Sequence, residues 1–265
     1  MDSTTQVSAI LILLLTLVVN VLFSRRRRQP FGLRSIPAFA LLTPTIGAAI
    51  EANHPLHLSY GSSALGGENT VLALASSELF YQVARQAAIG DTTPILTTSA
   101  PSTLPLAQDT LRRAYQSRGL LNRYHYSSAR WYPAGPRSLA FAAALTSMLR
   151  DDDVHASVLV GGFGSELALI AEAAARRDQT LIAASDQPEG QAIAYVLADE
   201  ALIGEEMFAA GAYLDENPRA SANAAVSDVL RWLLVLALVV ATLSAGNQAF
   251  AQLLGELLAR LQGGG

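Results

Sequence analysis

Short apolar segments alternate with longer helical segments through the middle of the chain, between residues 29 and 226. The expected strands are the apolar segments 56–60, 94–98, 129–132, 156–160 and 181–184. The expected helices are 38–52, 70–88, 105–117, 137–149, 165–177 and 187–197, with another beginning at Glu205. Strands that are separated by helices need crossover connections, which produce a mostly parallel sheet with helices on both faces. The sequence therefore predicts an α/β fold, a doubly wound Rossmann-like domain.

Both ends of the chain carry a long apolar segment. Residues 7–23 contain no charge, and four arginines follow directly: Arg25, Arg26, Arg27 and Arg28. This length is at the short end of what crosses a bilayer core of roughly 30 Å. A cleaved signal peptide would carry its positive charge before the apolar segment. The order found here therefore predicts an uncleaved transmembrane anchor, with the arginines in the cytoplasm. The arginines fix this topology, and they are also candidates for binding anionic lipid headgroups.

A second apolar segment covers residues 230–251, with Arg231 and Trp232 as its expected anchor at the cytoplasmic interface. The predicted organisation is a membrane anchor over 1–28, a cytoplasmic α/β domain over 29–226, and a transmembrane helix with an amphipathic, glycine-ended tail over 227–265. Both termini are expected outside the cytoplasmic membrane. Because the chain has 15% charged residues against about 25% in average soluble domains, its composition agrees with this arrangement.

Polar side chains recur at four-residue spacing within the second apolar segment: Ser244, Gln248 and Gln252, with Asn247 beside them. Such a stripe is costly against lipid, so we expect it to face another helix, and Asn20 of the first segment is a candidate partner. An alternative is that the chain from Gly246 onward lies at the outer interface as an amphipathic tail. Both interpretations predict association between helices, and therefore a homo-oligomer.

Two residue types are missing from the sequence. All 18 basic residues are arginine, which excludes a lysine-dependent phosphate loop and a lysine Schiff base. There is no cysteine, which excludes thiol nucleophiles, iron–sulfur clusters and cysteine zinc sites. The net charge of −4 argues against nucleic acid as a partner.

Two glycine-rich loops follow expected strands, where an open parallel sheet binds its ligands. The candidate cofactor-binding residues are Gly61, Gly66 and Gly67 in the first loop, and Gly162, Gly164, Ser165 and Asp186 in and after the second. Asp186 lies 22 positions beyond Gly164, near the spacing at which an acid reaches a ribose in dinucleotide-binding folds. However, Leu167 stands where the third glycine belongs. Tight strand-to-helix turns explain these glycines better than a nucleotide does, so no cofactor is expected.

No set of residues in the sequence indicates catalysis or metal binding. The histidines His54, His57, His125 and His155 are expected to be structural, and Asp151, Asp152 and Asp153 to be a solvated charge run. Glu205 and Glu206 suit the first turn of a helix better than paired acid–base work. No residue is therefore assigned a catalytic or metal-ligating role.

Five sequence blocks resemble an uncharacterised family of bacterial membrane proteins, a domain of unknown function frequent in filamentous green non-sulfur bacteria. The blocks are LRSIPAF, HPLHLSYGSSALGG, PLAQDTLRRAY, SVLVGGFGSELALIAEAAARR and ADEALIGEEMFAAGAYL, which span residues 33–214. The resemblance implies a membrane-anchored domain and carries no functional residues with it.

These observations favour a non-enzymatic, membrane-anchored scaffold that self-associates into a larger membrane assembly. One alternative is a tethered domain that binds a nucleotide or another small ligand, as a sensor or a degenerate enzyme. Another is an accessory subunit of a respiratory or photosynthetic complex, whose partners would be the other subunits of that complex.

We predict that the double substitution Gln248→Leu and Gln252→Leu lowers the mass of the native assembly, because it removes the polar contacts between helices. Native mass spectrometry in mild detergent measures this mass. An unchanged assembly would contradict a role for the polar stripe in association.

Overall fold

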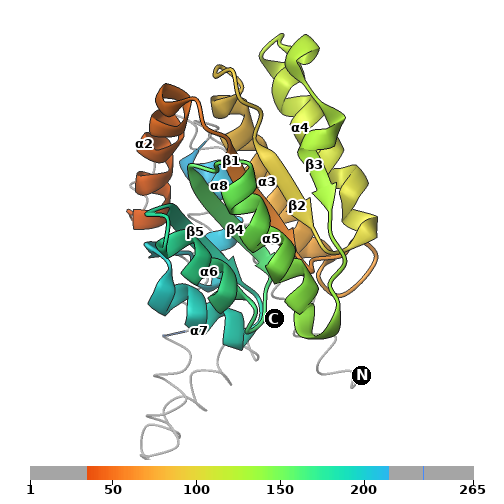
Figure 1. Ribbon diagram of the computed structural model, residues 1–265, viewed down its shortest axis with the longest axis vertical. Coiled ribbons are helices and arrows are strands. Elements are labelled where there is room, and N and C mark those ends of the chain that lie inside the picture. Colours follow the sequence, from red (N-terminus) through yellow and green to blue (C-terminus); the bar gives the residue numbers. More distant parts are fainter. Residues whose placement is uncertain (1–34, 215–234, 236–265) are drawn as a thin grey trace, which may run out of the picture. The chain divides into compact units, whose positions relative to one another are not determined.

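The computed structural model describes residues 35–214 and residue 235 (Figure 1). The described part contains a six-stranded sheet in which every pair of neighbours is parallel. The strands are β1 (Leu56–Gly61), β2 (Ile95–Thr98), β3 (Ala129–Trp131), β4 (Ala156–Gly162), β5 (Thr180–Ser185) and β6 (Glu200–Ala201). Their order is β3-β2-β1-β4-β5-β6, which is that of a doubly wound sheet. The predicted α/β class with a parallel Rossmann-like sheet is therefore confirmed for this part of the chain.

Helices cover both faces of the sheet (Figure 1). One layer contains α2 (Pro37–Ala52), α3 (Thr70–Ala87), α4 (Leu104–Ser117) and the short α8 (Ala210–Tyr213). The other layer contains α5 (Leu139–Asp151), α6 (Leu167–Ala175) and α7 (Pro188–Leu197). Each layer has its own apolar core, because side chains along a strand point alternately to the two faces. In β1, for example, Leu58 and Tyr60 are both fully buried in the core under α3.

The five strands expected from the sequence are present, with ends that differ by one or two residues. The sixth strand, β6, has only two residues and was not predicted, because so short a segment carries no alternation. The helix expected from residue 137 begins at Leu139, since Arg137 and Ser138 both have positive φ. The helix expected from Glu205 is instead a 3-10 turn, Gly204–Phe208, followed by α8.

Within residues 35–214, no helix has both the length and the apolar character needed to cross a bilayer. The two predicted spans, 7–23 and 230–251, lie outside the described residues. The residues predicted for topology, lipid contact and oligomerisation lie there too: Asn20, Arg25, Arg26, Arg27, Arg28, Arg231, Trp232, Ser244, Asn247, Gln248 and Gln252. The membrane anchors therefore stay predictions.

A buried polar row crosses the centre of the sheet. His57 of β1 is fully buried, with Nε2 at 2.8 Å from Thr97 Oγ1 and Nδ1 at 3.3 Å from Ser157 Oγ. Thr97 in turn donates to Ser59 Oγ at 2.8 Å. These contacts join β2, β1 and β4 through side chains as well as through the backbone ladder. His57 is thus a satisfied structural histidine, as expected.

Burial, together with the positive charge of Arg130, lowers the pKa of His57 to about 3. The unfolded chain takes up this proton near pH 6.5, so it binds more protons than the folded chain between pH 6.5 and about 3. The contribution of His57 to stability is therefore complete above pH 6.5 and is lost as the pH falls through this window. Each pH unit costs at most about 1.4 kcal/mol.

We predict that His57→Gln flattens the pH dependence of the free energy of unfolding between pH 6.5 and about 4 by up to about 1.4 kcal/mol per unit. Glutamine keeps hydrogen-bonding capacity at this position but does not titrate. Urea unfolding of both proteins at several pH values, followed by intrinsic fluorescence, measures the difference. If the free energy of unfolding depends on pH in the same way in both proteins, the fold does not hold His57 neutral.

Candidate functional site

The order of the strands reverses between β1 and β4, and the carboxyl ends of these two strands are where a doubly wound sheet places its ligand. Here the two strand ends contact each other very closely. A Cβ on Gly161 would lie 2.0 Å from the carbonyl oxygen of Tyr60. A Cβ on Gly61, whose φ is +58°, would lie 2.3 Å from the carbonyl oxygen of Gly162. These glycines are therefore required by contact between two backbones of the same chain.

Serines close the same junction with hydrogen bonds. The carbonyl of Gly162 accepts from the backbone N–H of Ser62 at 2.8 Å and from its hydroxyl at 2.9 Å. The N–H of Gly162 donates to Ser63 Oγ at 2.9 Å, and Ser63 is fully buried. On the other side of β1, the carbonyl of Gly61 accepts from the N–H of Ser99 at 2.9 Å. The polar groups of the first glycine loop nearest the sheet are thus used within the protein.

A second junction joins the ends of β4 and β5. Ser185 Oγ donates to the carbonyl of Phe163 at 2.6 Å and accepts from the N–H groups of Phe163 and Gln187 at 3.1 and 3.0 Å. Helix α7 packs directly on this junction, since a Cβ on Gly190 would lie 1.9 Å from the carbonyl oxygen of Phe163. In dinucleotide-binding folds, the third glycine of the fingerprint lets a helix pack closely on a strand. Here Gly190 lets α7 pack closely on the end of β4. Leu167, at that third position, is instead fully buried as the first residue of α6.

The cofactor-binding candidates that the sequence predicted lie in three different places in the structure. Gly61 and Gly162 lie in the closed junction between β1 and β4. Gly66 and Gly67 lie on the loop before α3, with open space where their side chains would be, and Thr70 Oγ1 accepts from the N–H of Gly66 at 2.9 Å. Gly164 and Ser165 line a cavity, and the exposed Asp186 directly follows β5, its pKa raised by partial burial.

The cavity lies beyond the carboxyl ends of β4 and β5 and has a volume of about 470 Å³. Three loops supply its lining, which consists of Arg137, Ser138, Gly164, Ser165, Glu166, Gln187 and Glu189. Its size falls within the range of about 300–1,000 Å³ that is usual for small-molecule sites. Two carboxylates and one guanidinium therefore share a single concave surface. We call it the edge cavity.

Glu166 is the most buried charged residue of the edge cavity, with 6% of its surface exposed. Its Oε1 accepts from the N–H of Gly164 at 2.9 Å, and no described residue hydrogen-bonds to its Oε2. This carboxylate occupies the residue before α6, where the positive end of the helix dipole favours a negative group. The same charge opposes a ligand phosphate at this helix terminus, the position that a dinucleotide uses in this fold.

Strained backbone lies at the rim of the edge cavity. Arg137 and Ser138 have φ values of 49° and 55°, both left-handed and neither a glycine. Each such residue costs of order 1 kcal/mol, and strain of this kind concentrates at functional sites. Sequence reasoning missed Arg137, Ser138, Glu166, Gln187 and Glu189, because they lie in three separate connections and match no motif. The only available signal was their position after a strand or before a helix.

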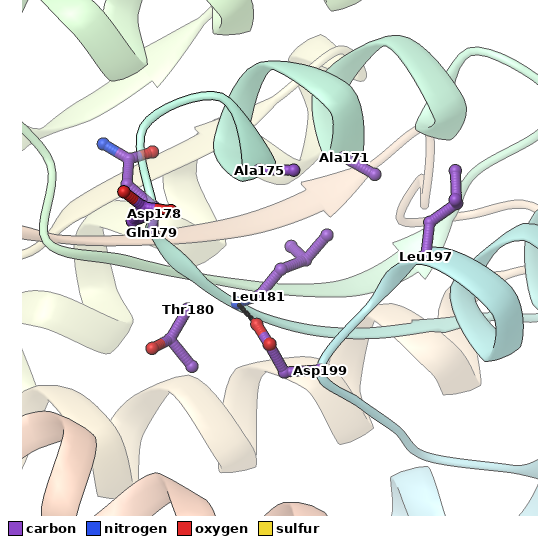
Figure 2. Close-up of a pocket in the computed structure, with 8 residues that line it drawn as sticks. All are labelled: Ala171, Ala175, Asp178, Gln179, Thr180, Leu181, Leu197 and Asp199. Atoms are coloured by element: carbon purple, nitrogen blue, oxygen red, sulfur yellow. Dashed lines mark hydrogen bonds between the residues drawn. The ribbon is translucent and has the colours of Figure 1, made fainter.

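A second cavity, of about 340 Å³, lies at the opposite edge of the sheet, where β5 begins (Figure 2). Figure 2 shows Asp199 directed at the β5 backbone, where its Oδ2 accepts from the N–H of Leu181 at 2.8 Å. Gln179 also lines this cavity, and its amide donates to the carbonyls of Leu149 and Val154. Both polar side chains thus hold the chain where it enters β5, which is a structural task.

Among the described residues, no group of three or more His, Asp or Glu side chains is arranged to hold a metal ion. His54 precedes β1 and pairs with Asp153 at 3.2 Å. Asp152 forms an ion pair with Arg130, so this charge run is partly structural. Glu206 accepts from the N–H of Ile203 at 2.9 Å, so it caps the 3-10 turn Gly204–Phe208.

The strand order, the two helical layers and the closed glycine junction define a doubly wound α/β domain of the Rossmann-like class. The chain belongs to the family described as a domain of unknown function, DUF6754, whose model matches residues 2–253. This confirms the resemblance to an uncharacterised family. Neither the curated proteins nor the solved structures contain a significant match to the chain.

We predict that Gly161→Ala destabilises the protein by about 2–3 kcal/mol, because the new methyl group meets the carbonyl oxygen of Tyr60. Gly47→Ala is the matched control: it lies within α2, and no atom lies within 4 Å of the new Cβ. This control should stabilise by about 0.5–1 kcal/mol. Denaturant unfolding compares the two, and equal stabilities would refute the close contact between β1 and β4.

Proposed function

We propose that this protein is a non-enzymatic, membrane-anchored scaffold that self-associates through its α/β domain and its two predicted membrane helices. The observation that carries the proposal is the closed junction between β1 and β4. A Rossmann-like enzyme keeps this place open for its cofactor. Here glycine backbones and serine hydroxyls of the chain itself pair with one another at this place, which favours a role as a folded body over one as a catalyst.

Helix α7 provides the contact surface for self-association in this proposal. Tyr195, Val196 and Leu197 are exposed by 71%, 74% and 46%. The chain carries no charged residue from Gly190 to Ala198, so the helix itself brings no charge into such a contact, although Asp178 and Asp199 line the cavity beside Leu197. A second copy of the same uncharged surface is a suitable partner, because neither copy needs an opposite charge to meet it. We call residues 195–197 the α7 surface.

The edges of the sheet favour association through helices over association through strands. The edge strands β3 and β6 have three and two residues, which gives another strand few backbone groups to pair with. Sheet extension between copies is therefore unfavourable. Two other contacts do not depend on the short edge strands. They are the contact through α7 and the contact through the polar stripe predicted in the second membrane segment.

In this proposal the predicted spans place the domain on the cytoplasmic face of the membrane, with both termini outside. The arginines Arg25–Arg28 would then face anionic lipid headgroups. A role as accessory subunit of a respiratory or photosynthetic complex uses the same surfaces with different partners. Partners that co-purify at a fixed stoichiometry would favour that alternative over self-association.

The nucleotide-binding alternative is supported less well by the geometry. A phosphate at the start of α6 would meet the buried carboxylate of Glu166. A phosphate at the first glycine loop would find the N–H groups of Ser62, Ser63 and Gly66 already paired within the protein. The proposal therefore includes no nucleotide cofactor.

We predict that Val196→Glu shifts the full-length protein in mild detergent toward smaller assemblies, because the new carboxylate would lose its hydration in the contact. Val71→Glu is the matched control, since Val71 is also an exposed helical valine, 67% accessible, on α3 in the other layer. Sedimentation velocity measures both. Equal effects of the two substitutions, or no effect of Val196→Glu, would exclude the α7 surface as the contact.

A further inference from the structure

The edge cavity contains the carboxylate of Glu166, of which one oxygen accepts a hydrogen bond from a described residue. Glu166 is 94% buried, its Oε1 is paired with the N–H of Gly164, and among the described residues its Oε2 has no hydrogen-bond donor. Glu166 Oε2 is not among the described side-chain atoms that are both buried and unpaired, so it opens to the cavity, where a donor can reach it. Glu166 Oε2 is therefore suited to accept a hydrogen bond from a ligand that binds in the cavity.

A second acceptor lies beside this oxygen. The position that a Cβ on Gly164 would occupy is 2.8 Å from Glu166 Oε2 and 3.0 Å from Gln187 Oε1. The two oxygens therefore lie close together beside Gly164, which admits both because it has no side chain. Two oxygens, one of them charged, match a group with several N–H donors and a positive charge. A primary ammonium has these properties.

The same cavity also contains a cation. Arg137 lines it, and no described residue forms an ion pair with Arg137. Its guanidinium is the side chain best suited to bind a carboxylate through two parallel hydrogen bonds. The strained left-handed backbone at Arg137 and Ser138 holds this residue at the rim. The cavity thus presents a negative site and a positive site to one ligand.

We propose that the edge cavity binds a small zwitterion, a free α-amino acid or a compound of the same chemistry. Its ammonium is held by Glu166 and Gln187, and its carboxylate by Arg137. A metal ion fits this site less well, because hard cations need about six oxygen ligands and two converge here. The proposal goes beyond the scaffold function and does not depend on it, since α7 presents its contact surface at the opposite end of the helix from Gln187.

Isothermal titration calorimetry on the full-length protein, with each proteinogenic amino acid in turn, tests the proposal. At least one of them should bind with a saturable heat. For that amino acid, the amine without the carboxylate and the acid without the ammonium should each bind about tenfold more weakly or worse. Failure of every amino acid to bind, or equal affinity for the amine, would overturn the proposal.

Variants assign the two ends of the ligand. Glu166→Gln keeps an acceptor for the N–H of Gly164 but removes the charge, and should weaken amino-acid binding about tenfold or more. Glu172→Gln is the matched control, an exposed glutamate of the same helix that pairs with Arg176 outside the cavity. It should leave binding unchanged. Unchanged binding by Glu166→Gln would overturn the assignment of the ammonium site.

The second variant keeps the test decisive if Glu166→Gln fails to fold. Arg137 is exposed, and asparagine tolerates its left-handed backbone, so Arg137→Asn should preserve the fold. It should weaken binding of the amino acid about tenfold and leave binding of the matching amine unchanged. Equal weakening of both ligands, or of neither, would overturn the role of Arg137.

Discussion

The close contact between the ends of β1 and β4 is the interaction on which the rest of the structure depends. The backbones at Gly61, Gly161 and Gly162 approach to distances that no side chain permits, and Ser62 and Ser63 join them by hydrogen bonds. This junction lies at the centre of the sheet, where the two helical layers diverge. It joins the ends of these two strands at the place where this fold usually binds a cofactor.

The general fold could be predicted from the sequence because alternation of strands and helices is a local signal. Five strands appear where their apolar runs lie, while β6 was missed because two residues carry no periodicity. The glycine loops were located correctly, and the tight-turn interpretation agrees with their contacts. The partner of each glycine was not predictable. The oxygen that excludes a side chain at Gly161 belongs to Tyr60, 101 positions earlier in the chain.

The edge cavity could be predicted only in part. Gly164 and Ser165 were identified through their glycine pattern, but the charges that give the cavity its chemistry were not. Arg137, Glu166 and Gln187 come from the ends of three different connections, and only the folded sheet brings them together. The left-handed backbone at Arg137 also carries no sequence signal, because arginine rarely adopts it. Tertiary packing, not local propensity, creates this site.

Thermal unfolding of the full-length protein with saturating NAD, NADP or ATP measures whether the carboxyl ends of β1 and β4 accept a nucleotide. Because the junction between β1 and β4 is closed and Glu166 opposes a phosphate, we expect the melting temperature to stay unchanged with each of them. A ligand present at a hundred times its Kd would stabilise the fold by about 2.7 kcal/mol, which is easily detected. A saturable rise in melting temperature with any of these nucleotides would contradict the closed junction and the scaffold function derived from it.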